Sequence, residues 1–212
     1  MPTPPDPAWD YDDWISYFRG DLMSSVAHDV KPLVSSGGLF GVPRQFFPYV
    51  EYLSGLVLGP ATQDKFSTTS QVRTFLKTWM NRVDHRYESH ADLLLAMWRH
   101  GLVHAYKPKV LAGPSGRRIS WASFDEGRTL VRPFRGQEAA TFTHLVPFLD
   151  PTGPSDVFPV SIFALVEDLE AILGIVAGDI ERERDTGHRT LGAKLKEAAT
   201  FLATPVPVDF TW

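Results

Sequence analysis

The feature that most constrains this chain is an apolar run at residues 90–109, HADLLLAMWRHGLVHAYKPK. Its leucines, methionine and tryptophan surround most of the circumference of a helix, and a helix that is apolar nearly all round lies at the centre of a fold. The run nevertheless contains Arg99, His100 and His104. Because such polar groups are rarely buried without a partner or a purpose, these three side chains are the first candidates for a functional site.

Apolar side chains recur at helical spacing along much of the rest of the chain, and turn residues separate the segments. The predicted helices span about residues 10–32, 43–58, 68–83, 88–105, 159–184 and 191–202. We expect Pro48 to interrupt the second helix unless it lies in the first turn. Pro108 ends the fourth helix, because the residue before a proline disfavours helical geometry.

Short apolar runs between the fourth and fifth predicted helices indicate strands rather than helices. Glycine-containing turns separate these runs, which is typical of β-hairpins. The predicted strands lie at residues 110–111, 119–121 and 129–131, and residues 142–148 form one more strand or an irregular segment.

These patterns together predict a mainly α fold, a helical bundle with a small β-hairpin insertion after the fourth helix. No linker is visible in the sequence, so we expect a single domain across residues 1–212. The insertion occupies about residues 109–150, and the proline-rich residues 1–9 form an extended tail.

The composition and charge of the chain exclude several classes of protein. The chain has no cysteine, which excludes disulfides and thiolate chemistry and is typical of the cytoplasm. Its N-terminus has neither the basic nor the apolar part of a signal peptide. The late apolar run at residues 160–178 contains Glu167, Asp168 and Glu170, too many charges for a membrane span. The net charge of −4 gives no overall basic excess, so any contact with RNA would need a local basic patch.

The residues from Arg99 to the end of the run carry a resemblance to a known family. Arg99 is followed by the polar His100, and His104 lies five positions after Arg99. From residue 101 the sequence continues as Gly-Leu-Val-His-Ala-Tyr-Lys-Pro-Lys. This sequence resembles the motif helix of the HEPN superfamily, an all-helical group that includes many RNA-cutting toxins and nucleotide-binding accessory domains. The close match covers residues 99–109, and the order of helices resembles the family more loosely.

The resemblance implies a function and a set of roles. In the HEPN family two motif helices meet across a homodimer and cut RNA without a metal or another cofactor. His104 would serve as general acid or base, Arg99 would stabilise charge on the phosphate, and His100 would orient the substrate or a water. RNA and a partner protein such as an antitoxin are the expected partners. The alternative is a non-catalytic, HEPN-like module that binds a nucleotide or a protein. A purely structural accessory domain is a third hypothesis.

Basic and aromatic residues follow the motif and form a candidate RNA-binding surface. The candidates are Tyr106, Lys107, Lys109, Arg117 and Arg118. Trp121 and the arginines of the next hairpin, Arg128, Arg132 and Arg135, extend this region. The alternative interpretation is an ordinary solvated β surface.

Two further patterns give weaker evidence for a functional site. His100 and His104 have the spacing of metal ligands, but no glutamate follows His100 as in zinc-protease helices, and we predict no metal. A second Arg-to-His spacing, Arg182 and His188, lies at a charged helix end without apolar surroundings and is interpreted as coincidence.

Overall fold

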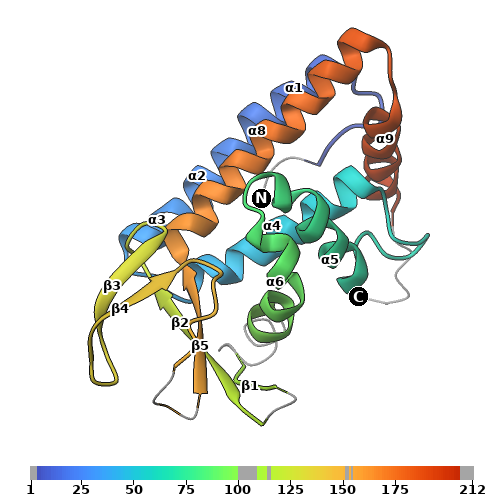
Figure 1. Cartoon of the computed structure of the whole chain (residues 1–212). Helices are drawn as coiled ribbons and strands as arrows, with labels where there is room; N and C mark the ends of the chain where they lie inside the picture. Colours follow the sequence, from blue (N-terminus) through green and yellow to red (C-terminus); the bar gives the residue numbers. More distant parts are fainter. Residues whose placement is uncertain (1–3, 100–108, 114–115, 151–152, 154, 206–212) are drawn as a thin grey trace, which may run out of the picture.

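The computed structural model describes residues 4–99, 109–113, 116–150, 153 and 155–205. A long N-terminal helical stretch comes first: α1 (Tyr11–Ser16), the π-helix η1 (Tyr17–Leu22), α2 (Met23–Asp29) and α3 (Lys31–Ser35). Asp10 caps its start, because its carboxylate accepts the backbone N–H groups of Asp12 and Asp13. In Figure 1 this stretch lies along α8 (Ile162–Thr186), the longest helix among the described residues. The apolar positions that predicted this helix are buried, namely Trp14, Phe18, Leu22 and Val26.

The central helices follow the predicted segments closely. They are α4 (Gly41–Leu58), α5 (Thr69–Thr78), the 3₁₀ turn η2 (Met80–Arg82), α6 (Arg86–Leu94) and the π-helix η3 (Leu95–Arg99). Thr68 and Gln71 form a capping box at the start of α5, which fixes where this helix begins. The expected interruption at Pro48 is wrong, because Pro48 lies inside α4 and the helix continues past it. Pro48 itself is exposed, and the burial of the neighbouring Phe46, Phe47 and Val50 offsets the hydrogen bond that the proline cannot donate.

The C-terminal helices are α8 and α9 (Thr190–Ala203). Gly187 ends α8 in the left-handed conformation that glycine adopts without strain, with φ of 75°. The Glu183 carboxylate then accepts the backbone N–H groups of Leu191 at 2.6 Å and Gly192 at 2.8 Å. This carboxylate occupies the positive end of α9 and holds the start of α9 to the end of α8. We refer to all these helices together as the helical body.

The strands lie between α6 and α8, in residues 111–161, which we call the β region. They are β1 (Leu111–Ala112), β2 (Arg118–Phe124), β3 (Thr129–Phe134), β4 (Gln137–Thr143) and β5 (Ser155–Ser161). The three-stranded sheet has the order β1-β2-β5, in which β1 is antiparallel and β5 parallel to β2. β3 and β4 form a separate antiparallel pair.

The expected fold class, a mainly α bundle with one small β-hairpin insertion, is therefore wrong. Five strands in two sheets replace the single hairpin, and the region extends to Ser161 rather than to about residue 150. The expected pairing of β2 with β3 is absent from the described sheets, because β2 pairs with β5 instead. Local patterns could not predict this pairing, since it joins Trp121 to Phe158, with β3 and β4 between them in the sequence.

Two apolar clusters accompany these two parts of the molecule. The larger one fills the helical body, where it includes Leu53, Phe75, Leu169 and Ile172, and it extends into the β region through Leu145, Phe158 and Val160. The smaller one lies within the β region and consists of Phe124, Ala140, Phe142 and Val157 with half-buried neighbours. In the part of the chain that the structure describes, no helix has the length and hydropathy needed to cross a membrane.

Candidate functional site

The helix that bears the predicted motif is described as far as Arg99. α6 passes directly into η3, and Leu94, Leu95 and Met97 pack into the core. The π-helical turns of η3 bring the chain to Arg99, and such turns recur at functional sites. Beyond that point the predicted catalytic residues His100 and His104, and the predicted RNA-binding residues Tyr106 and Lys107, lie outside the described residues, as does the side chain of Arg99.

Both ends of the motif segment meet at one place. The backbone N–H of Lys109 donates a hydrogen bond to the carbonyl oxygen of Met97, with a distance of 2.8 Å. Lys109 and Val110 are exposed, and the chain continues from them into β1. Met97 and Lys109, on either side of the motif segment, therefore lie next to each other, close to β1 at the edge of the three-stranded sheet.

The predicted basic surface is largely occupied by ion pairs. The Arg117 guanidinium binds the Asp156 carboxylate and donates to the carbonyl oxygen of Asp150 at 2.8 Å. Arg135 donates to the Asp150 carboxylate at 2.6 Å. Since a guanidinium that is held by a carboxylate offers less charge to a phosphate, neither arginine is a strong RNA ligand in this arrangement.

Three cations of the surface keep more of their charge exposed: Lys109, Arg118 and Arg132. Arg118 is paired in register with Ala112 of β1, two residues after Val110, so the strand pairing brings it close to the end of the motif segment. Trp121 lies further along β2 and packs edge-on against Phe40, with ring centroids 5.1 Å apart. Trp121 thus has a structural contact as well as its predicted role beside RNA bases.

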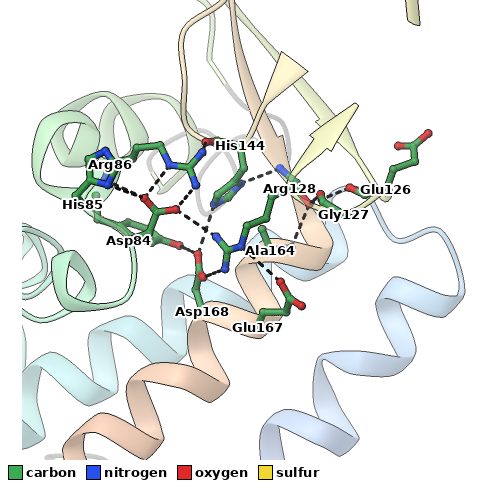
Figure 2. Close-up of polar contacts among 12 residues, drawn as sticks. Asp84, His85, Arg86, Glu126, Gly127, Arg128, His144, Ala164, Glu167 and Asp168 are labelled. Atoms are coloured by element: carbon green, nitrogen blue, oxygen red, sulfur yellow. Dashed lines mark hydrogen bonds and ion pairs between the residues drawn. The ribbon is translucent and has the colours of Figure 1, made fainter. Parts of the chain in front are cut away.

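Sequence reasoning did not predict the most elaborate polar cluster of the described residues, which lies where the β region meets the helical body. We call it the charge network, and it consists of Asp84, Arg86, Arg128, His144 and Asp168 (Figure 2). Asp84 precedes α6, Arg86 begins α6, Arg128 precedes β3, His144 follows β4, and Asp168 lies in α8.

Asp84 forms the first node of the charge network. Its carboxylate accepts the Arg86 Nε–H at 2.7 Å, a second contact from the same guanidinium, and the Arg128 Nη1–H at 3.2 Å. Burial alone would raise the pKa of Asp84. The hydrogen bonds from Arg86 and the charge of Arg128 outweigh that effect, so its pKa lies below the usual value.

Asp168 forms the second node and is completely buried. One carboxylate oxygen binds Arg128, and the other accepts the Tyr87 hydroxyl at 2.8 Å. Burial would raise the pKa of Asp168, but the contacts with His144 and Arg128 lower it overall. A single arginine thus joins the two carboxylates, because Arg128 binds both Asp84 and Asp168.

His144 is the third node and is also completely buried. Its Nδ1 accepts the backbone N–H of Ser161 at 3.0 Å, so we assign the ring proton to Nε2. Nε2 lies 3.6 Å from the Asp168 carboxylate, too far for a hydrogen bond. Burial lowers the pKa of His144 below its usual value despite the nearby carboxylate.

The chemistry of the charge network follows from its burial. His144 and Asp168 have no exposed surface, so they cannot reach a substrate from solvent. Among the described residues no group of three or more acidic, histidine or cysteine side chains is arranged to hold a metal ion. We therefore interpret the charge network as a connection between two parts of the fold rather than as a catalytic centre.

A scan against protein-family models found no match, and searches of the curated proteins and of the solved structures found none either.

Proposed function

We propose that this protein is a metal-independent endoribonuclease that acts through Arg99, His100 and His104 at the interface of a homodimer. The observation that carries the proposal is the motif segment itself, an Arg-His-x₃-His sequence in an apolar run that the sequence predicts to be a central helix. It resembles the catalytic segment of HEPN ribonucleases. The hydrogen bond between Lys109 and Met97 supports the proposal, because it holds the two ends of this segment together beside exposed basic residues.

The chemistry assigns one role to each residue. His104 takes the proton of a ribose 2′-hydroxyl, or donates one to the leaving 5′-oxygen, while the 2′-oxygen bonds to phosphorus and the P–O5′ bond breaks. Arg99 stabilises the charge that accumulates on the phosphate, since its fork matches phosphate oxygens. His100 orients the substrate or a water. Lys109 and Arg118 attract the flanking phosphates, and the absence of cysteine supports action in the cytoplasm.

The test is cleavage of a set of structured and unstructured RNAs in the presence of EDTA. We expect cleavage by the native protein and a loss of at least 100-fold in Arg99→Ala and His104→Ala, because general acid–base catalysis contributes about that much or more. The chain offers a matched control at its second Arg-to-His spacing. Arg182→Ala and His188→Ala remove the same residue types from an exposed helix end and should cleave normally. If the native protein leaves every RNA intact at high concentration, the proposal fails.

The dimer requires its own measurement. Light scattering should give twice the chain mass at working concentrations. Mixing Arg99→Ala with His104→Ala protein tests whether the site is composite. If each site takes Arg99 from one protomer and His104 from the other, some heterodimers regain one complete site and activity returns in part. A strictly monomeric protein that still cleaves RNA would contradict the composite site.

A second candidate is the non-catalytic binding module, and one cavity favours it. This cavity has a volume of about 380 Å³ and is lined by Pro48, Tyr49, Tyr52 and Leu202 with polar groups from Asp29 and Gln45. An apolar wall with a few polar groups, in this range of volume, is typical of sites for small ligands. Burial raises the pKa of Tyr52, which keeps its hydroxyl neutral. Binding of nucleosides at this cavity, measured by ligand-detected NMR and abolished in Tyr52→Ala, would favour the module if RNA cleavage is absent.

A further inference from the structure

The charge network lies at the junction of the β region and the helical body. Arg128 and His144 belong to the β region, whereas Arg86 and Asp168 belong to helices (Figure 2). Ser161 is the last residue of β5. The Arg86 guanidinium also donates to the carbonyl oxygen of His144 at 2.7 Å. His144 is therefore held by one side-chain contact to the end of β5 and by a backbone contact to α6.

The position of His144 leaves no room for a second ring proton. Nδ1 faces the backbone N–H of Ser161, which is a donor, so a proton on Nδ1 would place two donors against each other. Ser161 is also the N-cap of α8, since its hydroxyl accepts the Ala164 N–H at 3.1 Å and donates to the carbonyl oxygen of Gly127 at 2.6 Å. Protonation of His144 would thus disturb the point at which β5, the β2–β3 turn and α8 meet.

The backbone beside His144 is strained. Leu145 has a φ of 59°, in the left-handed region that is unfavourable for a residue with a β-carbon. The residue is completely buried, and its N–H donates to the carbonyl oxygen of Pro159 at 2.9 Å. Such conformations persist only where the surrounding contacts enforce them, and opening of the junction would release this strain.

The β3–β4 pair has the means to open without the helical body. Its buried residues Ala140 and Phe142 form a small apolar cluster with Phe124 and Val157. The larger cluster of the helical body extends into the rest of the β region, where it includes Leu145, Phe158 and Val160. Regions with their own contacts open as cooperative units at a lower free energy than global unfolding.

We propose that the charge network is an acid-sensitive latch: protonation of His144 releases the β3–β4 pair, which Arg128 and His144 flank, from α6 and α8 while β5 and the helical body stay folded. This role is separate from RNA cleavage and does not depend on it. Charged and titratable groups face His144 from each element that packs against it, namely Asp168 from α8, Arg86 and Tyr87 from α6, Arg128 before β3 and Asp84 before α6.

The direction of the pH effect follows from the lowered pKa of His144. The closed form favours the neutral ring, so the latch is fully closed above the ordinary histidine pKa of about 6.5 and weakens as the pH falls below it. The pKa values of Asp84 and Asp168 are also lowered, so these carboxylates weaken the junction only below about pH 3.8. His144 therefore dominates the charge network between about pH 6.5 and pH 4.

Hydrogen–deuterium exchange at pH 7.5 and pH 5.0, corrected for the intrinsic exchange rates, tests the proposal on the native protein. One histidine that stays neutral in the closed form changes the open population by at most about 30-fold over this range, ten-fold for each pH unit below 6.5. We expect peptides from β3 and β4 to lose between 10-fold and 30-fold in protection, and peptides from β5, α4 and α9 to change less than two-fold. An equal loss in both sets of peptides, or no loss in β3 and β4, would overturn the latch.

His90 provides the matched control, because burial also lowers its pKa and its ring packs 6.0 Å from Phe158. His144→Asn retains an acceptor for Ser161 but does not titrate, so its exchange should be the same at both pH values. His90→Asn should keep the native response, and loss of the response in His90→Asn alone would overturn the assignment to His144. If His144→Asn does not fold, ¹⁵N imidazole spectra of the native protein decide. A neutral His144 ring in the closed form at pH 5.0 supports the latch, and protonation at or above pH 6.5 excludes it.

Discussion

In the helical body, α4, α5, α8 and α9 meet through apolar side chains, whereas the β region meets the helices through the charge network as well as through apolar residues such as Phe158 and Val160. Phe75, Leu53 and Ile172 are buried among other apolar residues and need no particular partner. Arg128 and Asp168, by contrast, tolerate few replacements, because each satisfies the charge of the other. Apolar packing adapts to small changes in its neighbours, while a buried ion pair loses most of its value when one partner is removed. The junction should therefore be the part of the fold that responds most to single polar changes.

The largest expected effects come from truncating one large apolar side chain in each cluster. Phe142→Ala in the β region should cost about 3–5 kcal/mol locally, and Leu53→Ala in α4 should cost about 2–5 kcal/mol globally, since both side chains are buried. We expect the two substitutions to destabilise different parts of the molecule. By hydrogen–deuterium exchange, Phe142→Ala should lower protection in the β region and leave α4 and α9 protected, whereas Leu53→Ala should lower protection throughout. Equal loss across the chain in both variants would show that the two clusters unfold as one unit.

The next effect concerns the charge network. Asp168→Asn retains the shape of the side chain but leaves Arg128 without its buried partner, and we expect a loss of about 3 kcal/mol in the free energy of unfolding. Urea denaturation followed by circular dichroism measures this loss. Asp92→Asn is the control, because Asp92 binds Arg73 and Lys77 on the exposed surface of the helical body. Exposed pairs contribute at most about 1 kcal/mol, so similar losses in the two variants would contradict the distinction between junction and surface.

Much of the helical body could be predicted from the sequence because its signals are local. The capping box at Thr68 and the left-handed Gly187 mark helix ends within a few residues of the pattern that they terminate. Pro48 was misjudged because packing from other helices outweighs the local penalty of a proline. Local signals decide where a helix lies, and tertiary contacts decide whether an exception is tolerated.

The β region and the charge network could not be predicted in the same way. β5 was not predicted, because its last residues were expected to begin a helix and nothing near it indicates that it pairs with β2. The bond between Tyr87 and Asp168 joins residues 81 positions apart. One signal was available: Asp168 lies at helical spacing with Leu165 and Ile172, on the buried face of α8. A carboxylate at a core position requires a partner, although the sequence does not say which arginine provides it.

A smaller effect compares two helix caps with different surroundings. Thr68 and Ser161 both cap a helix with a hydroxyl group, but Ser161 also donates to Gly127 and is completely buried. Thr68→Ala should cost about 1 kcal/mol, the usual value for a lost cap. Ser161→Ala should cost about 2 kcal/mol, since it also leaves the Gly127 carbonyl without its donor. Thermal or urea unfolding of both variants measures the difference, and equal costs would mean that the contact with the β2–β3 turn adds nothing to stability.

The smallest expected change in stability comes from Arg118→Ala, and the neighbouring Arg117→Ala is the comparison. Arg118→Ala should change the free energy of unfolding by less than about 0.5 kcal/mol, as is usual for an exposed side chain, whereas Arg117→Ala removes the ion pair with Asp156 and should destabilise the β region more. For RNA binding we expect the opposite order, with the larger effect from Arg118→Ala. If the exposed Arg118 contacts a phosphate, Arg118→Ala should reduce the slope of log affinity against log salt by about 1, and Arg117→Ala should change it less. Affinity measured over a range of salt concentrations tests this, and a larger salt effect for Arg117 would mean that its ion pair opens when RNA binds.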